Sequence, residues 1–136
     1  MHPVGVLDTN AVVRLERFEP GELPETPVIT AVTLAELSVG PLVTDDHRER
    51  AARQARLQET EVVFEPLPFD AAAARAFGRV AASLRRSGRK PAARAFDALI
   101  AATAIANALP LYTSNPQDFQ GIDGLEVVHL VHPDAL

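Results

Sequence analysis

Val4-Gly5-Val6-Leu7-Asp8-Thr9-Asn10 joins a short apolar run to an acid, a hydroxyl and an amide. A continuous apolar run of this length is typical of a strand buried in a parallel sheet, and the polar residues after it indicate a turn. In such sheets, ligands bind in the crevice outside the carboxyl ends of the strands. The sequence therefore predicts that Asp8 lies at the ligand-binding edge of a sheet, although Asp8 could also simply cap the helix that follows.

Strand and helix signals alternate along the rest of the chain. Apolar runs between turn residues predict further strands at residues 28–30, 62–64, 111–113 and 127–130. Helical spacing of apolar residues, or a long stretch without glycine and proline, predicts helices at residues 11–18, 33–39, 45–59, 69–87 and 96–107. This alternation favours a three-layer α/β sandwich, in which helices flank a central, mostly parallel sheet of four or five strands.

The composition fits one domain formed by residues 1–136. Hydrophobic residues make up 47% of the chain, which is ample for a single core. The chain has no cysteine, which excludes disulfides, thiolate metal sites and cysteine nucleophiles and fits a reducing cytosol. The first apolar run is far too short for a signal or membrane segment, so we expect a cytoplasmic protein that does not enter membranes.

The net charge of −5 argues against a general nucleic-acid coat protein, since non-specific phosphate binding usually needs a basic surface. A local basic segment nevertheless lies close to Asp97 in the sequence, and its cations are Arg85, Arg86, Arg89, Lys90 and Arg94. The sequence is therefore compatible with a local track for phosphates.

Acidic residues in four separate segments suggest one acidic pocket: Asp8, Glu36, Asp97 and Asp118. A parallel α/β fold can gather such segments at one edge of its sheet. Carboxylates within a few ångströms of each other repel by about 4 kcal/mol per close pair at an effective dielectric of about 20, so such a site requires a cation. Ligands that offer only oxygen favour Mg²⁺ or Mn²⁺.

Glu36 and Asp97 each have an alternative explanation. Thr33-x-x-Glu36 has the pattern of a capping box, in which the glutamate returns to the backbone N–H of Thr33. Asp97 stands in a strongly apolar helix, where a charge needs a partner or a metal, but the helix dipole also favours an aspartate in a first turn. Arg94 is a candidate ion-pair partner of Asp97 or a candidate contact for a phosphate.

Asp118 lies in a polar turn, and Asn115, Pro116 and Asp118 are all ordinary turn formers. Asn115 competes with Asp118 as the fourth group of the site, because an amide oxygen can also bind a hard cation or an ordered water. The sequence leaves both candidates open.

Four motifs occur together in one order: Leu7–Asn10, Ala35–Leu37, Phe96–Ala104 and Tyr112–Phe119. With these motifs, the chain resembles the PIN-domain ribonucleases, and most closely the VapC-type toxins of bacterial toxin–antitoxin pairs. The similarity extends over nearly the full length, from Val4 to about Val128. Any one motif alone is weak evidence for the resemblance, and the four motifs together are strong evidence for it.

The resemblance implies a PIN-like fold and a ribonuclease that depends on Mg²⁺ or Mn²⁺. It implies that Asp8, Glu36, Asp97 and Asp118 hold one or two divalent ions, with support from Thr9, Asn10, Thr113 and Asn115. It also implies an RNA substrate, for which Arg94 is a candidate phosphate contact, a small VapB-like antitoxin that blocks the acidic groove, and a homodimer.

We expect metal-assisted hydrolysis of a phosphodiester, in which no protein nucleophile is needed and carboxylates position the cation. One alternative is an aspartate-nucleophile phosphatase, because Asp8 follows the first strand. That chemistry usually requires a second aspartate two residues later, where this chain has Asn10. A further alternative is a non-catalytic member of the same fold that binds RNA or a protein partner.

Overall fold

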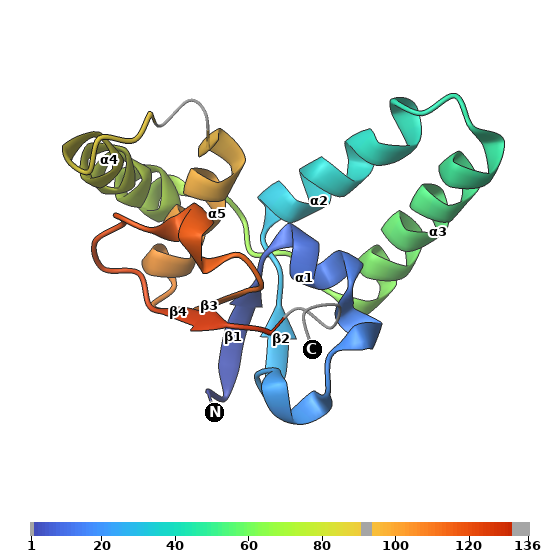
Figure 1. Ribbon diagram of the computed structural model, residues 1–136, viewed down its shortest axis with the longest axis horizontal. Helices are drawn as coiled ribbons and strands as arrows, with labels where there is room; N and C mark the ends of the chain where they lie inside the picture. Colours follow the sequence, from blue (N-terminus) through green and yellow to red (C-terminus); the bar gives the residue numbers. More distant parts are fainter. Residues whose placement is uncertain (1, 91–93, 132–136) are drawn as a thin grey trace.

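A four-stranded sheet forms the middle layer of the computed structural model, which describes residues 2–90 and 94–131. Its strands are β1 (Val4–Leu7), β2 (Thr26–Val28), β3 (Leu111–Thr113) and β4 (Val127–His129). The strand order is β2-β1-β3-β4, and every neighbouring pair is parallel. The carboxyl ends of the strands therefore meet at one edge of the sheet (Figure 1).

β1 is a central strand, paired with β2 on one side and with β3 on the other. Val6 and Leu7 are fully buried, as expected for a strand that is covered on both faces. Gly5 makes room for a neighbour, because a Cβ at this position would lie 2.5 Å from Cε1 of the Tyr112 ring. The buried parallel strand predicted at residues 4–7 is confirmed.

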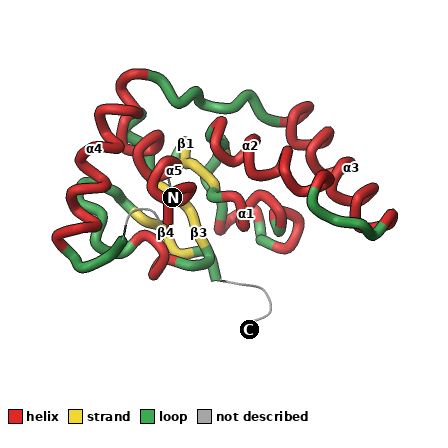
Figure 2. Tube along the Cα trace, turned by 90° about the horizontal axis from the view of Figure 1, so that it is seen from above, coloured by secondary structure: helices red, strands yellow, loops and turns green. Residues whose placement is uncertain are grey.

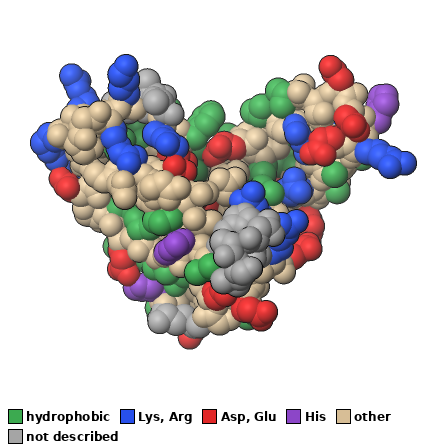
Figure 3. Space-filling model, viewed as in Figure 1, with side chains coloured by type: hydrophobic (Ala, Val, Ile, Leu, Met, Phe, Trp, Pro, Cys, Tyr) green, Lys and Arg blue, Asp and Glu red, His purple; other side chains and the backbone are tan. Residues whose placement is uncertain are grey.

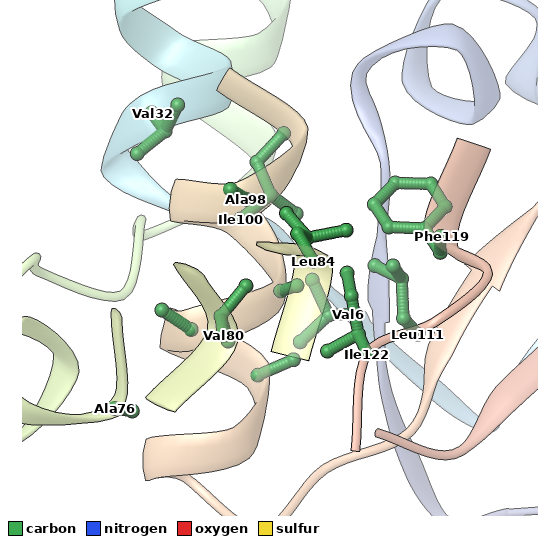
Figure 4. Close-up of a cluster of buried hydrophobic side chains, with 13 residues drawn as sticks. Val6, Val32, Ala76, Val80, Leu84, Ala98, Ile100, Leu111, Phe119 and Ile122 are labelled. Atoms are coloured by element: carbon green, nitrogen blue, oxygen red, sulfur yellow. The ribbon is translucent and has the colours of Figure 1, made fainter. Parts of the chain in front are cut away.

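One face of the sheet is covered by α4 (Ala71–Arg86) and α5 (Ala95–Ala106). Apolar side chains of both helices join Val6 and Leu111 in one buried cluster, which Figure 4 shows in close-up. Burial of this apolar surface is the main stabilisation of the packed layers, at roughly 25 cal/mol for each Å² removed from water.

The other face is covered by α1 (Thr9–Val13), α2 (Ala31–Val39) and α3 (His47–Val63). Leu7 and Tyr112 of the sheet belong to a second buried cluster on this side. Seen from above, the sheet lies between the two groups of helices (Figure 2). The α/β sandwich with a parallel central sheet that was predicted from the sequence is confirmed.

Side-chain caps set the first residues of three helices. Oxygens of Thr30, Asp46 and Asp70 accept hydrogen bonds from first-turn N–H groups of α2, α3 and α4 respectively. Caps of this kind are worth about 1 kcal/mol each. Because Thr30 caps α2, this helix begins at Ala31, two residues before the predicted start.

The strand predicted at residues 62–64 does not form. Val62 and Val63 complete the last turn of α3, and the N–H of Phe64 donates to the carbonyl of Thr60 over 2.9 Å. The prediction was wrong because a short Val-Val-Phe run looks alike in a strand and at the end of a helix. Only a single parallel bridge, between Thr30 and Leu67, follows at this point of the chain.

β3 forms at the predicted residues 111–113, and the remaining predicted elements form with shifted ends. β2 occupies residues 26–28 rather than 28–30. α1 ends at residue 13 rather than 18, and a short 3₁₀ helix, η1 (Leu15–Arg17), follows it. α3 extends beyond the predicted end at residue 59. Across residues 2–90 and 94–131, we find no helix with the length and apolar character that crossing a membrane requires.

Candidate active site

Asp8 lies at the carboxyl end of β1 and is only 4% exposed. One carboxylate oxygen, Oδ1, accepts from the backbone N–H of Ala11 over 2.9 Å and so caps α1. The other oxygen, Oδ2, accepts from the hydroxyl of Thr113 over 2.5 Å. Asp8 is therefore both a helix cap and a residue of the sheet edge, and the two interpretations of the sequence hold together.

Thr113 connects β3 to β1 at this edge. Its hydroxyl donates to Asp8 and accepts from the backbone N–H of Asn115 over 3.0 Å, so both of its functions are used. Thr113 is fully buried, which leaves its side chain little freedom to turn away. The Asp8 carboxylate is thus held from two sides, by a backbone N–H and by a buried hydroxyl.

Glu36 projects from α2 and is held by a different threonine. The hydroxyl of Thr9 donates to Oε1 of Glu36 over 2.6 Å and lies 3.0 Å from the hydroxyl oxygen of Thr33. Because the single proton of Thr9 goes to Glu36, the Thr33 hydroxyl donates to Thr9. The capping-box interpretation is wrong, since the N–H of Thr33 is bound by Thr30 and Thr33 lies inside α2.

Asp97 and Asp118 both lie near the guanidinium of Arg94. Asp97 is in the first turn of α5, and Asp118 is in the short 3₁₀ helix η5 (Pro116–Phe119) that follows β3. Nη1 of Arg94 lies 2.9 Å from Oδ1 of Asp118 and 3.9 Å from Oδ2 of Asp97. The predicted pairing of Arg94 with Asp97 is therefore a loose contact, and the close contact is with Asp118.

Burial and the charges of the neighbouring acids raise the pKa of two site residues, Asp97 and Asp8. The pKa of Asp97 is raised to about 6, chiefly by burial and then by the charges of Asp118, Glu36 and Asp8, while the charge of Arg94 opposes the rise. Burial also raises the pKa of Asp8, while its bonds from Thr113 and Ala11 lower it and the charges of Asp118 and Glu36 raise it. Side chains from four separate elements therefore meet in one acidic site.

The donor set of this site fits a hard divalent cation. It offers carboxylate oxygens and buried hydroxyls, and the mutual repulsion of its acids would be relieved by positive charge. In residues 2–90 and 94–131, no three acids or histidines already stand at the mutual spacing of a metal centre. The carboxylates are instead directed to hydroxyls of Thr9 and Thr113 and to Arg94.

Two buried threonines support the site in a way that the sequence did not predict. Thr30 and Thr33 are both fully buried and fix α2 and Thr9 respectively. The sequence presented Thr33 only as part of a capping box with Glu36, and its contact with Thr9 depends on how α1 packs against α2. Asn10 is exposed, and the backbone N–H of Asn115 supports Thr113; direct roles of both amide side chains at the site stay predictions.

The surface has a notch between two lobes, one containing α4 and α5 and the other containing α2 and α3 (Figure 3). Acidic side chains lie at the notch, and Lys and Arg side chains gather on the α4 lobe. A separate groove of about 390 Å³ lies between α1, η1 and α3, and Val13, Arg17 and Val63 are among its lining residues. None of the four site acids lines this groove.

Residues 5–125 match the family model of the PIN domain. The chain is 38% identical to Ribonuclease VapC5 of Mycobacterium tuberculosis, with 93% of each chain covered. It is 33% identical to VapC ribonuclease Y4jK of Sinorhizobium fredii, with 94% of this chain and 98% of the relative covered. A crystal structure of VapBC-5, a member of the VapBC family of toxin–antitoxin systems from M. tuberculosis, has a TM-score of 0.82 and 35% identity and covers 94% of this chain and 99% of its own.

The chain therefore belongs to the PIN-domain family. Within that family its relatives are the VapC ribonucleases, and the resemblance seen in the four sequence motifs is confirmed.

Proposed function

We propose that this protein is a divalent-metal-dependent ribonuclease and the toxin of a toxin–antitoxin pair. The observation that carries the proposal is the meeting of Asp8, Glu36, Asp97 and Asp118, from four separate elements, at the carboxyl edge of the sheet. The VapC relatives, which are named ribonucleases, support the same reaction class.

Asp8, Glu36, Asp97 and Asp118 would hold Mg²⁺ or Mn²⁺. When bound, the cation supplies the Lewis acidity and the positive charge that phosphodiester hydrolysis requires. The chain's own contribution is positioning: Thr113 and the Ala11 N–H fix the Asp8 carboxylate, while Thr9, backed by Thr33, fixes Glu36. Partners of this kind set the orientation of ligating carboxylates.

Two side chains near Asp97 support a single-stranded RNA substrate. Phe96 is 53% exposed on the first turn of α5, and unpaired bases stack on exposed aromatic rings. Arg94 offers a guanidinium to a backbone phosphate. Both lie directly beside an acid of the site, so a base and a phosphate could be held close to the cation.

The phosphatase alternative is less well supported. That chemistry usually requires a second acid two residues after the nucleophile, and Asn10 at this position cannot act as that acid. The non-catalytic alternative predicts RNA binding that is insensitive to metal and to all four acids.

The partner that we propose is a VapB-like antitoxin, as in the VapBC-5 complex. The groove between α1, η1 and α3 offers the exposed side chains of Val13 and Val63 to a partner segment, next to charged lining residues such as Arg56 and Glu59. Laying an apolar helix face into such a groove is a common mode of peptide recognition. A homodimer also stays a prediction, which light scattering on the purified protein tests.

The test is cleavage of single-stranded RNA by wild type, Asp97→Asn and Asp123→Asn over a range of Mg²⁺ and Mn²⁺ concentrations. Asp123 pairs with Arg86 on the surface and serves as the matched control. We expect cleavage by wild type and Asp123→Asn, none by Asp97→Asn, and none after chelation. Equal cleavage by Asp97→Asn and wild type would contradict the proposal.

A further inference from the structure

The positively charged side chain of Arg94 contacts two acids of the site, Asp118 and Asp97. It stands at the N-terminal cap position of α5, and one guanidinium nitrogen, Nη1, makes both contacts, at 2.9 Å to Asp118 and 3.9 Å to Asp97. A two-pronged guanidinium–carboxylate pair would be stronger, but the contact here uses a single nitrogen. The side chain is 45% exposed, so water competes with the contact and the pair is weak.

The contact with Asp118 engages an oxygen that a cation would need. Asp118 also exerts the largest effect of any neighbouring charge on Asp97, so the two carboxylates stand close together. A divalent cation bound between them would carry more charge than a guanidinium at the same place. It would repel Arg94 and take over Oδ1 of Asp118.

We infer that Arg94 is an internal counter-ion that competes with the divalent cation for Asp118 and, once displaced, binds a phosphate of the RNA. The inference rests on the proposed function and adds a regulatory step to it. In the metal-free protein Arg94 neutralises part of the acidic site. In the metal-loaded protein its guanidinium is free at the rim of the same site.

A coupling between the two ligands follows. Metal binding releases Arg94 for the phosphate, and a phosphate that holds Arg94 away from Asp118 favours metal binding by the same factor. Arg94 therefore weakens the affinity for metal in the absence of RNA and restores it when RNA is present. This would limit metal loading of the protein while no substrate is bound.

The test measures Mn²⁺ binding calorimetrically, without RNA, to wild type, Arg94→Gln, Asp118→Asn and the double variant. We expect Arg94→Gln to bind Mn²⁺ about three- to tenfold more tightly than wild type, because the competing cation is gone. In the Asp118→Asn background, Arg94→Gln should change the Mn²⁺ affinity by less than about twofold, because the carboxylate for which Arg94 and the metal compete is gone.

Two further variants test whether the effect depends on the position and on the charge of Arg94. Arg48→Gln removes the same charge from the exposed first turn of α3, on the other lobe, and should leave Mn²⁺ affinity unchanged. Arg94→Lys keeps the charge and should stay within about twofold of wild type. In cleavage at saturating Mn²⁺, Arg94→Gln should raise KM more than it lowers kcat, because a phosphate contact is lost.

The outcomes distinguish this inference from the proposed function. The counter-ion role would be overturned if Arg94→Gln bound Mn²⁺ no more tightly than wild type. It would also be overturned if Arg94→Gln raised the Mn²⁺ affinity equally in the Asp118→Asn background, whatever the cleavage assay showed. A wild type that binds Mn²⁺ but cleaves no RNA would instead overturn the proposed function. In that case tighter Mn²⁺ binding by Arg94→Gln would still support competition at Asp118.

Discussion

At the scale of single residues, ionisation of Asp97 lowers the stability of the folded protein. Burial and the neighbouring acids raise the pKa of Asp97 to about 6, above that of an unfolded aspartate. The folded protein therefore holds the Asp97 proton more tightly than the unfolded chain does. The stabilisation of the folded protein by this proton is fully present below a pH of about 4. It is lost as the pH rises to about 6. The ionised site is thus a strained state that a cation would relieve.

Asp97→Asn should consequently stabilise the metal-free protein at a pH of about 7.5, by on the order of 1 kcal/mol after allowance for solvent screening. It should also flatten the decline in stability between a pH of about 4 and about 6. Urea unfolding in the presence of a chelator measures both effects, with Asp123→Asn as the control for loss of a surface carboxylate. A variant less stable than wild type at a pH of about 7.5 would refute this account of the site.

Thr113 carries a second prediction at this scale. Thr113→Val preserves the shape of the side chain but removes the hydroxyl that donates to Asp8 and accepts from Asn115. We expect RNA cleavage to fall about 10- to 100-fold, as is typical when the partner of a metal-binding carboxylate is lost. Thr60→Val, which removes a buried hydroxyl bonded to a carbonyl within α3, is the matched control. Full activity of Thr113→Val would show that Asp8 needs no such support.

At the scale of elements, the sequence predicted β1, β3 and the long helices well, because burial and caps act locally. The predicted third strand was wrong because residues 62 and 63 complete the last turn of α3, which a short apolar run does not reveal. The capping box at Thr33 and Glu36 was wrong because Thr30, three residues earlier, caps α2. The pairing of Thr9 with Glu36 joins two elements through side chains, which no local pattern encodes.

The groove beside α3 gives a prediction for this element. Val63 lines the groove and is 62% exposed, whereas its neighbour Val62 is 86% exposed and does not line it. Val63→Glu should reduce co-purification of the antitoxin at least about tenfold, since a charge would replace one of the apolar contacts of the groove, next to Glu59. Val62→Glu should have little effect, and both variants should cleave RNA normally. Equal capture of antitoxin by Val63→Glu and wild type would exclude this groove as the contact.

At the scale of the whole molecule, the fold converts distance in sequence into proximity. The strand order β2-β1-β3-β4 puts the ends of β1 and β3 side by side, and α2 and α5 reach the same edge from opposite faces. The sequence suggested one acidic pocket from the order and settings of the four acids, and in the structure their charges act on Asp97 and Asp8, while their role as metal ligands stays a prediction. The contact of Arg94 with Asp118 was not predicted from the sequence, because it depends on how η5 packs against the start of α5.

The central claim is that these four carboxylates together bind one kind of hard cation. The most direct measurement is anomalous diffraction at the manganese edge from crystals of the protein soaked in Mn²⁺. We predict a peak in direct contact with carboxylate oxygens of both Asp8 and Asp97, lost in crystals of Asp97→Asn. A peak elsewhere on the molecule, or no peak at saturating Mn²⁺, would contradict the claim.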